Sequence, residues 1–118
     1  EELEVEIRGR DALTGLPRRV VVTSVDVREA LAEPIRKILD TIKVVLERTP
    51  PELSADLVQT GITMCGGGSL IRGLPELIER EIELPTRIAP NPLQSGARGT
   101  AAIVENYDYY APFLDRGV

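Results

Sequence analysis

The segment from residue 61 to residue 73 constrains the fold more than any other part of the chain. It reads as a short apolar strand, three consecutive glycines (Gly66, Gly67 and Gly68) and the start of a helix. Residues without a Cβ leave a strip of backbone that a flat ligand can approach to contact distance. The helix that follows offers unpaired N–H groups and a positive dipole end to a phosphate. The segment lacks the Gly-Lys-Ser/Thr ending of a P-loop and the GxGxxG fingerprint. From spacing alone, a nucleotide site and a plain strand-to-helix turn both stay open.

Composition bounds the class of protein. The chain has 118 residues, the size of one ordinary domain, and its 42% hydrophobic and 28% charged residues indicate a globular protein. The net charge is −5 and the 14 basic residues are scattered, so we expect no nucleic-acid partner and no anionic membrane patch. No apolar run approaches the ~20 residues of a membrane span, and no signal peptide is recognisable. Because the first residue is Glu1, we expect an excised piece or an incomplete chain.

The inventory of reactive side chains is small. Cys65 is the single cysteine, so it cannot form a disulfide within the chain, which favours a reducing cytoplasm. We expect Cys65 to act as a small hydrophobe at the end of a buried strand. The chain has no histidine, which removes the commonest metal ligand and the commonest general base. We therefore predict no catalytic residue and no metal ligand in this chain.

Hydrophobic periodicity predicts a hairpin and then a long helix. Alternation over residues 3–8, turn residues over 9–17 and a valine-rich run over 18–23 predict two antiparallel strands. Apolar residues at three- and four-residue spacing predict a helix to residue 48, with Asp26 and Glu29 as a capping box at its start. Pro34 lies inside this pattern, so we expect a kink or break near residues 32–34.

The second half of the chain reads as an alternation of helices and strands. The expected elements are a helix over 51–58, a strand over 62–65, one helical turn over 69–72, a helix over 74–82, a strand over 86–89 and a helix from 93 to about 107. Gly61 suits the position just past the first of these helices. The two strands should form a partial sheet with exposed edges, which invite pairing with another chain.

Two features near the C-terminus leave alternatives open. Gly96 and Gly99 lie within the last predicted helix, where each glycine costs about 1 kcal/mol against Ala, so we expect close packing against another element. The aromatic residues are gathered at the end of the chain, at Tyr107, Tyr109, Tyr110 and Phe113. They form either a tail folded back over a groove or a docking patch for a partner.

From about residue 3 to residue 105, the chain resembles the C-terminal third of the MreB family, bacterial actin homologues that help to maintain rod shape. The matching segments are RDALTGLP (10–17), VREAL (27–31), LERTPPEL (46–53), Gly61-Ile62 with GGGSLIRG (66–73), and NPL (91–93). The resemblance implies an α/β fold, the C-terminal part of an actin-like (ribonuclease H-like) ATPase fold. Within it we expect a hairpin of a small subdomain (1–25), part of the large subdomain of the second actin-like domain (26–106) and an aromatic tail (107–118).

The same resemblance implies a function and a site. It implies an ATP-binding, filament-forming protein that maintains cell shape by organising cell-wall synthesis, with ATP and Mg²⁺ bound by the complete protein. The residues expected to line the nucleotide cleft are Gly66, Gly67, Gly68, Ser69, Leu70 and Ile71. Both phosphate-binding hairpins and the residues that position the attacking water would lie upstream of Glu1. We therefore expect this chain alone to bind no ATP, or only weakly, and to be inactive.

The resemblance also implies partners and a location. Self-association into filaments is expected, together with membrane proteins of cell-shape control and cell-wall synthesis, in the cytoplasm at the inner face of the plasma membrane. Cys65 stands where this family usually has Thr, Gly96 where a larger aliphatic is common, and the tail beyond Glu105 has no counterpart. The alternatives are another ATPase on the same fold, of the sugar-kinase or chaperone type, and a stand-alone protein-interaction module that needs no nucleotide.

Overall fold

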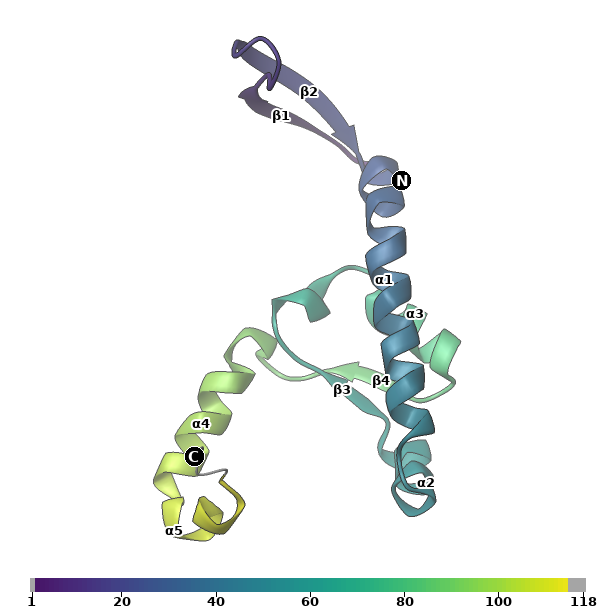
Figure 1. Cartoon of the computed structure of the whole chain (residues 1–118), viewed down its shortest axis with the longest axis vertical. Helices are drawn as coiled ribbons and strands as arrows, with labels where there is room; N and C mark the ends of the chain where they lie inside the picture. The colour runs from purple at the N-terminus through teal and green to yellow at the C-terminus, as the bar shows by residue number, and fades with distance from the viewer. Residues whose placement is uncertain (1, 115–118) are drawn as a thin grey trace. The chain divides into compact units, whose positions relative to one another are not determined.

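The computed structural model describes residues 2–114 and places them in a mixed arrangement of helices and strands (Figure 1). The strands β1 (Glu4–Arg10) and β2 (Pro17–Thr23) come first, and the long helix α1 (Ser24–Glu47) follows. The remaining elements are α2 (Pro51–Thr60), β3 (Ile62–Met64), the 3-10 helix η1 (Gly67–Leu70), α3 (Leu74–Ile82), β4 (Thr86–Ile88), η2 (Pro92–Gln94), α4 (Ser95–Glu105), α5 (Tyr107–Tyr110) and η3 (Ala111–Phe113). The chain divides between Val45 and Leu46 into two compact units, whereas the predicted boundaries at residues 25 and 106 stay predictions.

The first unit begins with the predicted antiparallel hairpin, which is confirmed. Its register runs from Glu4 opposite Thr23 to Arg10 opposite Pro17, so the turn covers fewer residues than expected. Because side chains alternate across a strand, Ile7 and its partner Val20 lie on one face. Both of these side chains are exposed. The hairpin therefore presents an apolar face that no described residue covers fully.

Asp11 organises the turn of the hairpin. Its Oδ1 accepts hydrogen bonds from the backbone N–H groups of Leu13 (2.9 Å) and Thr14 (3.0 Å). Its Oδ2 accepts one from Nη1 of Arg18 at 2.9 Å. The N–H groups of Thr14 and Leu13, and then the Arg18 guanidinium, hold the pKa of Asp11 below its ordinary value of 3.8. The charged form of Asp11 is thus the one that fits this turn.

The start of α1 is a capping box that lies one turn earlier than predicted. The Thr23 Oγ1 accepts a hydrogen bond from the backbone N–H of Asp26 at 3.1 Å, and the Asp26 Oδ2 accepts one from the backbone N–H of Thr23 at 2.8 Å. These reciprocal bonds satisfy two N–H groups at the helix start. The Thr23 N–H and hydroxyl groups lower the pKa of Asp26. Asp26 is therefore the third residue of the helix, and the predicted partnership with Glu29 is wrong.

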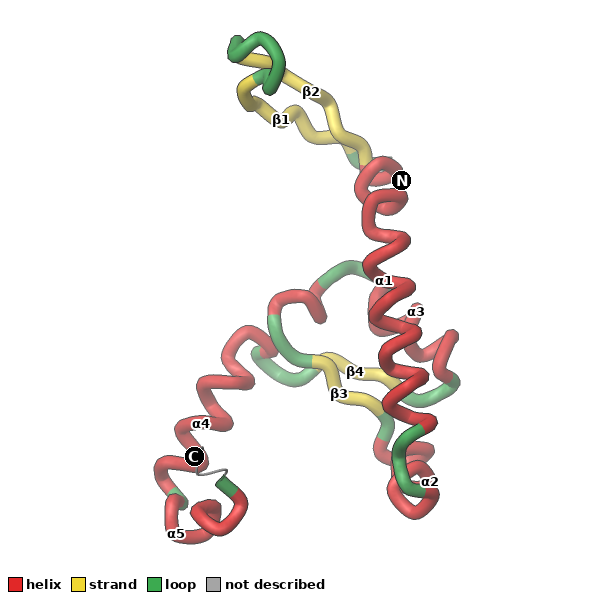
Figure 2. Tube along the Cα trace, in the orientation of Figure 1, coloured by secondary structure: helices red, strands yellow, loops and turns green. Residues whose placement is uncertain are grey.

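Pro34 does not break α1, so the predicted break near residues 32–34 is wrong, whereas the alternative of a kink there stays a prediction. The helix runs without interruption from Ser24 to Glu47 with Pro34 inside it, and Figure 2 draws it as one continuous coil. Proline has no N–H to donate to the carbonyl of Ala30, so this position forgoes one helical hydrogen bond. The remaining turns of a 24-residue helix keep theirs, and this outweighs the local cost.

The second unit is built on a parallel pair of strands. Residue Ile62 of β3 lies opposite Thr86 of β4, and Met64 lies opposite Ile88. Gly61 ends α2 with a positive φ of 70°, and a Cβ there would collide with the carbonyl of Pro85. The Ile62 N–H donates to that same carbonyl at 2.7 Å. The predicted glycine past the helix is confirmed, and so is the two-stranded sheet, whose outer edges are unpaired among residues 2–114.

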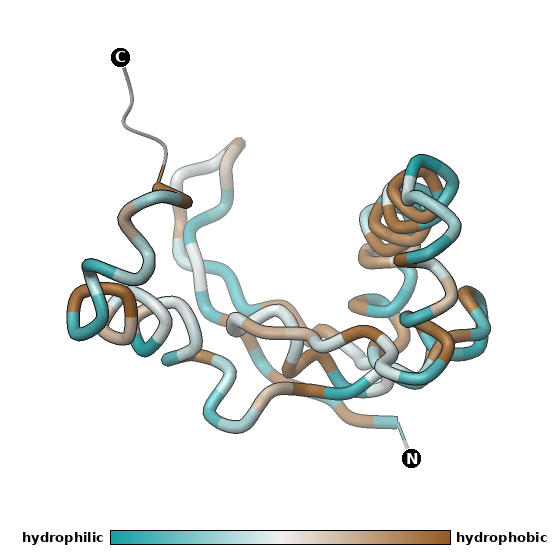
Figure 3. The backbone as a smooth tube through the Cα atoms, turned by 90° about the horizontal axis from the view of Figure 1, so that it is seen from below, coloured by the Kyte–Doolittle hydropathy of each residue, from teal (hydrophilic) through white to brown (hydrophobic). Residues whose placement is uncertain are grey.

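A small core holds α3 against this region. The predicted helix over 74–82 is confirmed at both ends, and its residues Leu74 and Ile78 are buried, as is Ser69. Apolar positions recur along the trace far beyond this core (Figure 3), and many large apolar side chains stay exposed. The three-residue strand β3 ends before Cys65, which is exposed. The prediction that Cys65 is a buried hydrophobe is therefore wrong.

The C-terminal helix differs from its prediction. The turn η2 precedes it, α4 ends at Glu105, and a Cβ at Gly96 or Gly99 would meet nothing within 4 Å. The close packing expected at these glycines is not found among residues 2–114. The rings of Tyr109 and Tyr110 stack edge to face at 5.0 Å, while Tyr109 and Phe113 are 70% and 76% exposed. The tail is thus not folded over a groove in its described part, and residues 115–118 lie outside it.

Within residues 2–114, no helix has the length and apolar character needed to cross a membrane.

Replacing Pro34 with Ala tests the account of α1. The substitution supplies the missing N–H and removes the clash of the ring with the preceding turn. We expect Pro34→Ala to raise the free energy of unfolding by up to about 3 kcal/mol. Thermal unfolding followed by circular dichroism measures the change. The matched control is the exposed neighbour Glu33→Ala, which loses only the ion pair with Lys37. Equal melting curves for Pro34→Ala and the wild type would contradict this account.

Candidate glycine-lined binding site

The glycine strip begins with a hydrogen bond between the loops that follow β3 and β4. The backbone N–H of Gly66 donates to the carbonyl of Pro92 at 2.8 Å. Gly66 has a φ of 80°, a conformation that residues with a side chain rarely adopt. The bond fixes the strip at the ends of the two strands. Ligands of parallel sheets commonly bind at such carboxyl ends.

The hydroxyl of Ser69 is used inside the protein. Ser69 is 2% exposed, and its Oγ donates to the carbonyl of Gly66 at 2.7 Å. The backbone N–H of Ser69 approaches the same carbonyl at 3.3 Å. These bonds join η1 to Gly66, the residue that precedes it. Ser69 therefore positions the strip, and its hydroxyl is committed to an internal hydrogen bond.

The three glycines are not equivalent. A Cβ built on Gly66 or Gly68 would meet nothing within 4 Å, whereas one built on Gly67 would lie 3.1 Å from Cδ2 of Leu93. Gly67 thus faces a neighbouring side chain, and Gly66 and Gly68 face open space. Of these two, only Gly68 lacks a positive φ. At Gly68, therefore, the missing side chain leaves the backbone accessible to a ligand, whereas the backbone conformation itself does not require glycine.

Leu70 and Ile71 follow the glycines and are 55% and 37% exposed. The predicted helical turn over 69–72 is found two residues earlier, as the four-residue helix η1. The backbone N–H of Ile71 donates a hydrogen bond to the carbonyl of Gly68 at 3.2 Å. A helix this short has a weak dipole, so the expected attraction for phosphate is small. The strip suits contact with a flat, uncharged group better than with an anion.

The described residues near the strip offer little acid–base or metal chemistry. No three His, Cys, Asp or Glu residues between positions 2 and 114 come together as ligands for a metal ion. The chain has no histidine, the commonest general base. The arrangement can bind and orient a ligand.

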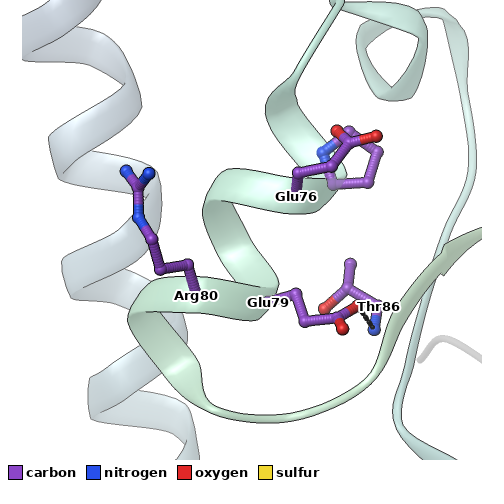
Figure 4. Close-up of a pocket in the computed structure, with 5 residues that line it drawn as sticks. Glu76, Glu79, Arg80 and Thr86 are labelled. Atoms are coloured by element: carbon purple, nitrogen blue, oxygen red, sulfur yellow. Dashed lines mark hydrogen bonds between the residues drawn. The ribbon is translucent and has the colours of Figure 1, made fainter.

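A surface cavity of about 390 Å³ lies elsewhere in the second unit. It is lined by Pro75, Glu76, Glu79, Arg80 and Thr86 (Figure 4). The Glu79 Oε2 accepts a hydrogen bond from the backbone N–H of Thr86 at 2.9 Å, while Arg80 extends away from the two carboxylates. None of the residues predicted for the site lines this cavity. Its two glutamates disfavour a phosphate, so the glycine strip remains the candidate.

Comparison with known proteins identifies the family of the chain. The family model described as MreB/Mbl protein matches residues 1–111. The chain belongs to the MreB/Mbl family.

Members of this family are identical to the chain at about a third to a half of the aligned positions. The Bacillus subtilis cell shape-determining protein Mbl is 47% identical over 105 residues, which are 89% of this chain and 32% of Mbl. The Escherichia coli cell shape-determining protein MreB is 38% identical over 110 residues, which are 93% of this chain and 32% of that protein. The chain thus spans about a third of the length of these curated relatives.

Solved MreB structures share the fold. The ADP-bound structure of MreB5 of Spiroplasma citri matches with a TM-score of 0.82 at 38% identity, over 90% of this chain and 32% of MreB5. The AMPPNP-bound structure of MreB5 matches with a TM-score of 0.83 at 36% identity, over 95% of this chain and 34% of MreB5. The fold is therefore part of the actin-like fold of MreB, as the resemblance implied.

Sequence reasoning missed Pro92 and Leu93, which support the strip from the loop after β4. The signal was present in the run Pro90-Asn91-Pro92 directly after the predicted strand 86–89, because parallel strands end at one edge of a sheet. What the sequence did not reveal is that Leu93 lies against Gly67 in particular.

Because Gly67 faces Leu93 and Gly68 faces open space, replacing each of them with Val should have different effects. Gly67→Val forces Leu93 to move, which we expect to lower the free energy of unfolding by about 1 kcal/mol. Gly68→Val enters open space and leaves Leu93 in place. Thermal unfolding and methyl NMR shifts of Leu93 compare the two variants. The same Leu93 shift in both would show that the strip is not oriented as described.

Proposed function

We propose that this chain is the C-terminal third of an ATP-binding, filament-forming bacterial actin homologue that maintains cell shape by organising cell-wall synthesis. The observation that carries the proposal is the match to the MreB/Mbl family over residues 1–111. The structural similarity to MreB5 over most of the chain supports it. Because the chain spans about a third of its relatives, ATP binding and assembly are properties of the complete protein.

In this proposal, the strip from Gly66 to Ile71 is one wall of the nucleotide site. The open faces of Gly66 and Gly68 let a flat nucleoside approach the backbone. A side chain at either position would prevent this approach. Leu70 and Ile71 add apolar surface beside it. The similar MreB5 structures are bound to ADP and to AMPPNP, which supports a nucleotide as the ligand.

ATP with Mg²⁺ supplies a phosphoanhydride that water can cleave once the metal has neutralised its charge. The glycines fit the nucleoside end of such a ligand, while residues 2–114 bring together no set of metal ligands. We therefore assign this chain the binding and orientation of the nucleoside. Metal coordination and activation of water belong to other segments of the complete protein.

Nucleotide affinity tests this wall. Isolated, the 118-residue chain should bind ATP at about millimolar or worse, because a micromolar site is worth roughly 8 kcal/mol and one wall retains less than half of that. In the complete protein, Gly68→Val should weaken ATP binding about tenfold or more, since the side chain fills space that the nucleoside needs. Calorimetry measures both affinities. Gly99→Val is the control, because Gly99 also faces open space but lies on α4. Unchanged affinity in Gly68→Val would exclude the strip from the site.

We further propose that the first unit contributes to filament contacts, together with the corner at residues 49–56. Loops on a rigid scaffold commonly carry such contacts, and the hairpin holds the turn at residues 10–17 on two paired strands. The two arginines beside this turn both have exposed side chains: Arg18 pairs with Asp11 at 2.9 Å, and Arg19 pairs with Glu6 at the longer distance of 3.6 Å. The proposed location is the cytoplasm at the inner face of the plasma membrane, with membrane proteins of cell-wall synthesis as partners.

Charge reversal at Arg19 tests this contact without dismantling the turn. Charges at the edge of an interface change the rate and salt dependence of association more than the core affinity. Arg19→Glu should raise the critical concentration for polymerisation, most strongly at low salt, and leave ATP affinity unchanged. Sedimentation of the complete protein across salt concentrations measures it. Arg72→Glu, a reversal in the second unit, is the comparison. Identical pelleting curves for wild type and Arg19→Glu would remove Arg19 from the interface.

A further inference from the structure

The outer edge of β4 offers very few backbone donors to another strand. Successive N–H groups of a strand point alternately toward its two edges. The N–H of Ala89 donates to the carbonyl of Met64 on β3 at 2.8 Å, so the N–H groups of Thr86 and Ile88 point away from β3. Pro90, the next position with this orientation, has no N–H. The outer edge of β4 therefore has two donors, at Thr86 and Ile88.

A side chain of the same molecule occupies one of these two donors. The backbone N–H of Thr86 donates to Oε2 of Glu79 on α3 at 2.9 Å, which is the dashed line in Figure 4. The N–H of Ile88 has no partner among residues 2–114, and the Ile88 side chain is 38% exposed. An added strand would thus find a single free donor on this edge.

The edge at Thr86 is open to solvent. The surface cavity of about 390 Å³ lies beside Thr86, so within residues 2–114 no side chain packs over this point of the edge. Glu76 lines the same cavity, one turn before Glu79 on α3, and Arg80 extends away from both carboxylates. A strand that approached here would have to break the bond to Glu79 and bury its carboxylate, which is costly without a new partner for the charge.

We propose that the Glu79 carboxylate is an autoinhibitory contact that prevents a strand of another molecule from adding to the outer edge of β4. It occupies the Thr86 N–H and places negative charge where an incoming strand would bring a carbonyl oxygen. Short strands and charged side chains are devices by which proteins protect the edges of their sheets. The contact is separate from the proposed filament contacts, which lie in the first unit and at residues 49–56.

The test is the growth of thioflavin T fluorescence in the nucleotide-free complete protein, held below its melting temperature. Glu79→Ala frees the Thr86 N–H and removes the charge, so growth should be about tenfold faster than in the wild type, the effect of losing one charge-assisted hydrogen bond. Glu79→Gln keeps an acceptor for that N–H without the charge and should give an intermediate rate. Glu81→Ala, on the same helix but outside the cavity, is the control and should match the wild type.

A second substitution separates strand addition from partial unfolding. Ile88→Pro removes the remaining outward donor and takes no hydrogen bond from β3. Combined with Glu79→Ala, it should return the growth of fluorescence to the wild-type rate. If the double variant grows as fast as Glu79→Ala or faster, the growth comes from unfolding and the inference is overturned. Ile88→Lys, which places a charge on the edge, should have the same effect and replaces Ile88→Pro if circular dichroism shows that proline disturbs the fold.

Hydrogen exchange in the complete wild-type protein provides a second arm. The N–H of Ile88 should exchange rapidly and the N–H of Thr86 slowly, because Thr86 alone of the two is hydrogen-bonded. Protection of the Ile88 N–H would mean that another segment of the protein already pairs with this edge, which overturns the inference. A wild-type rate of fluorescence growth in Glu79→Ala would overturn it as well.

Discussion

The close approach of Gly61 to Pro85 is the constraint on which the second unit depends. A side chain at residue 61 would collide with the Pro85 carbonyl, and that carbonyl also accepts the N–H of Ile62. The contact sets the register in which β3 and β4 begin. Two further bonds continue the pairing, from Ala89 to Met64 and from Gly66 to Pro92. The position of the glycine strip is thus decided several residues before the strip itself, at the end of α2.

Much of this architecture follows from the sequence, because local patterns determine it. The periodicity of α3 fixes both its ends, since Leu74 and Ile78 recur on one face and Pro75 suits a first turn. Alternation predicts the hairpin, because one face of each strand is apolar. Gly61 marks the end of α2 because few other residues adopt its positive φ. In each case the structure depends on residues that lie close together in the chain.

The failures have physical reasons as well. Pro34 disfavours helical structure at its own position. The rest of the long helix keeps its hydrogen bonds, and these outweigh the cost at Pro34. Cys65 lies past the end of a strand that is shorter than predicted. Within the site, the run of three glycines predicts a Cβ-free strip, but only the fold reveals that Leu93 covers Gly67 and that Ser69 points inward. Contacts between residues distant in sequence, such as Gly67 and Leu93, are not encoded in spacing.

We propose that the backbone at Gly66 and Gly68 contacts the nucleoside in this member of the MreB/Mbl family. The most direct measurement is a crystal structure of the complete protein with AMPPNP. We expect the nucleoside to lie against the open faces of Gly66 and Gly68, with Leu93 still covering Gly67. A nucleotide bound away from residues 66–71, or a strip whose open faces are filled by other side chains of the protein, would contradict it.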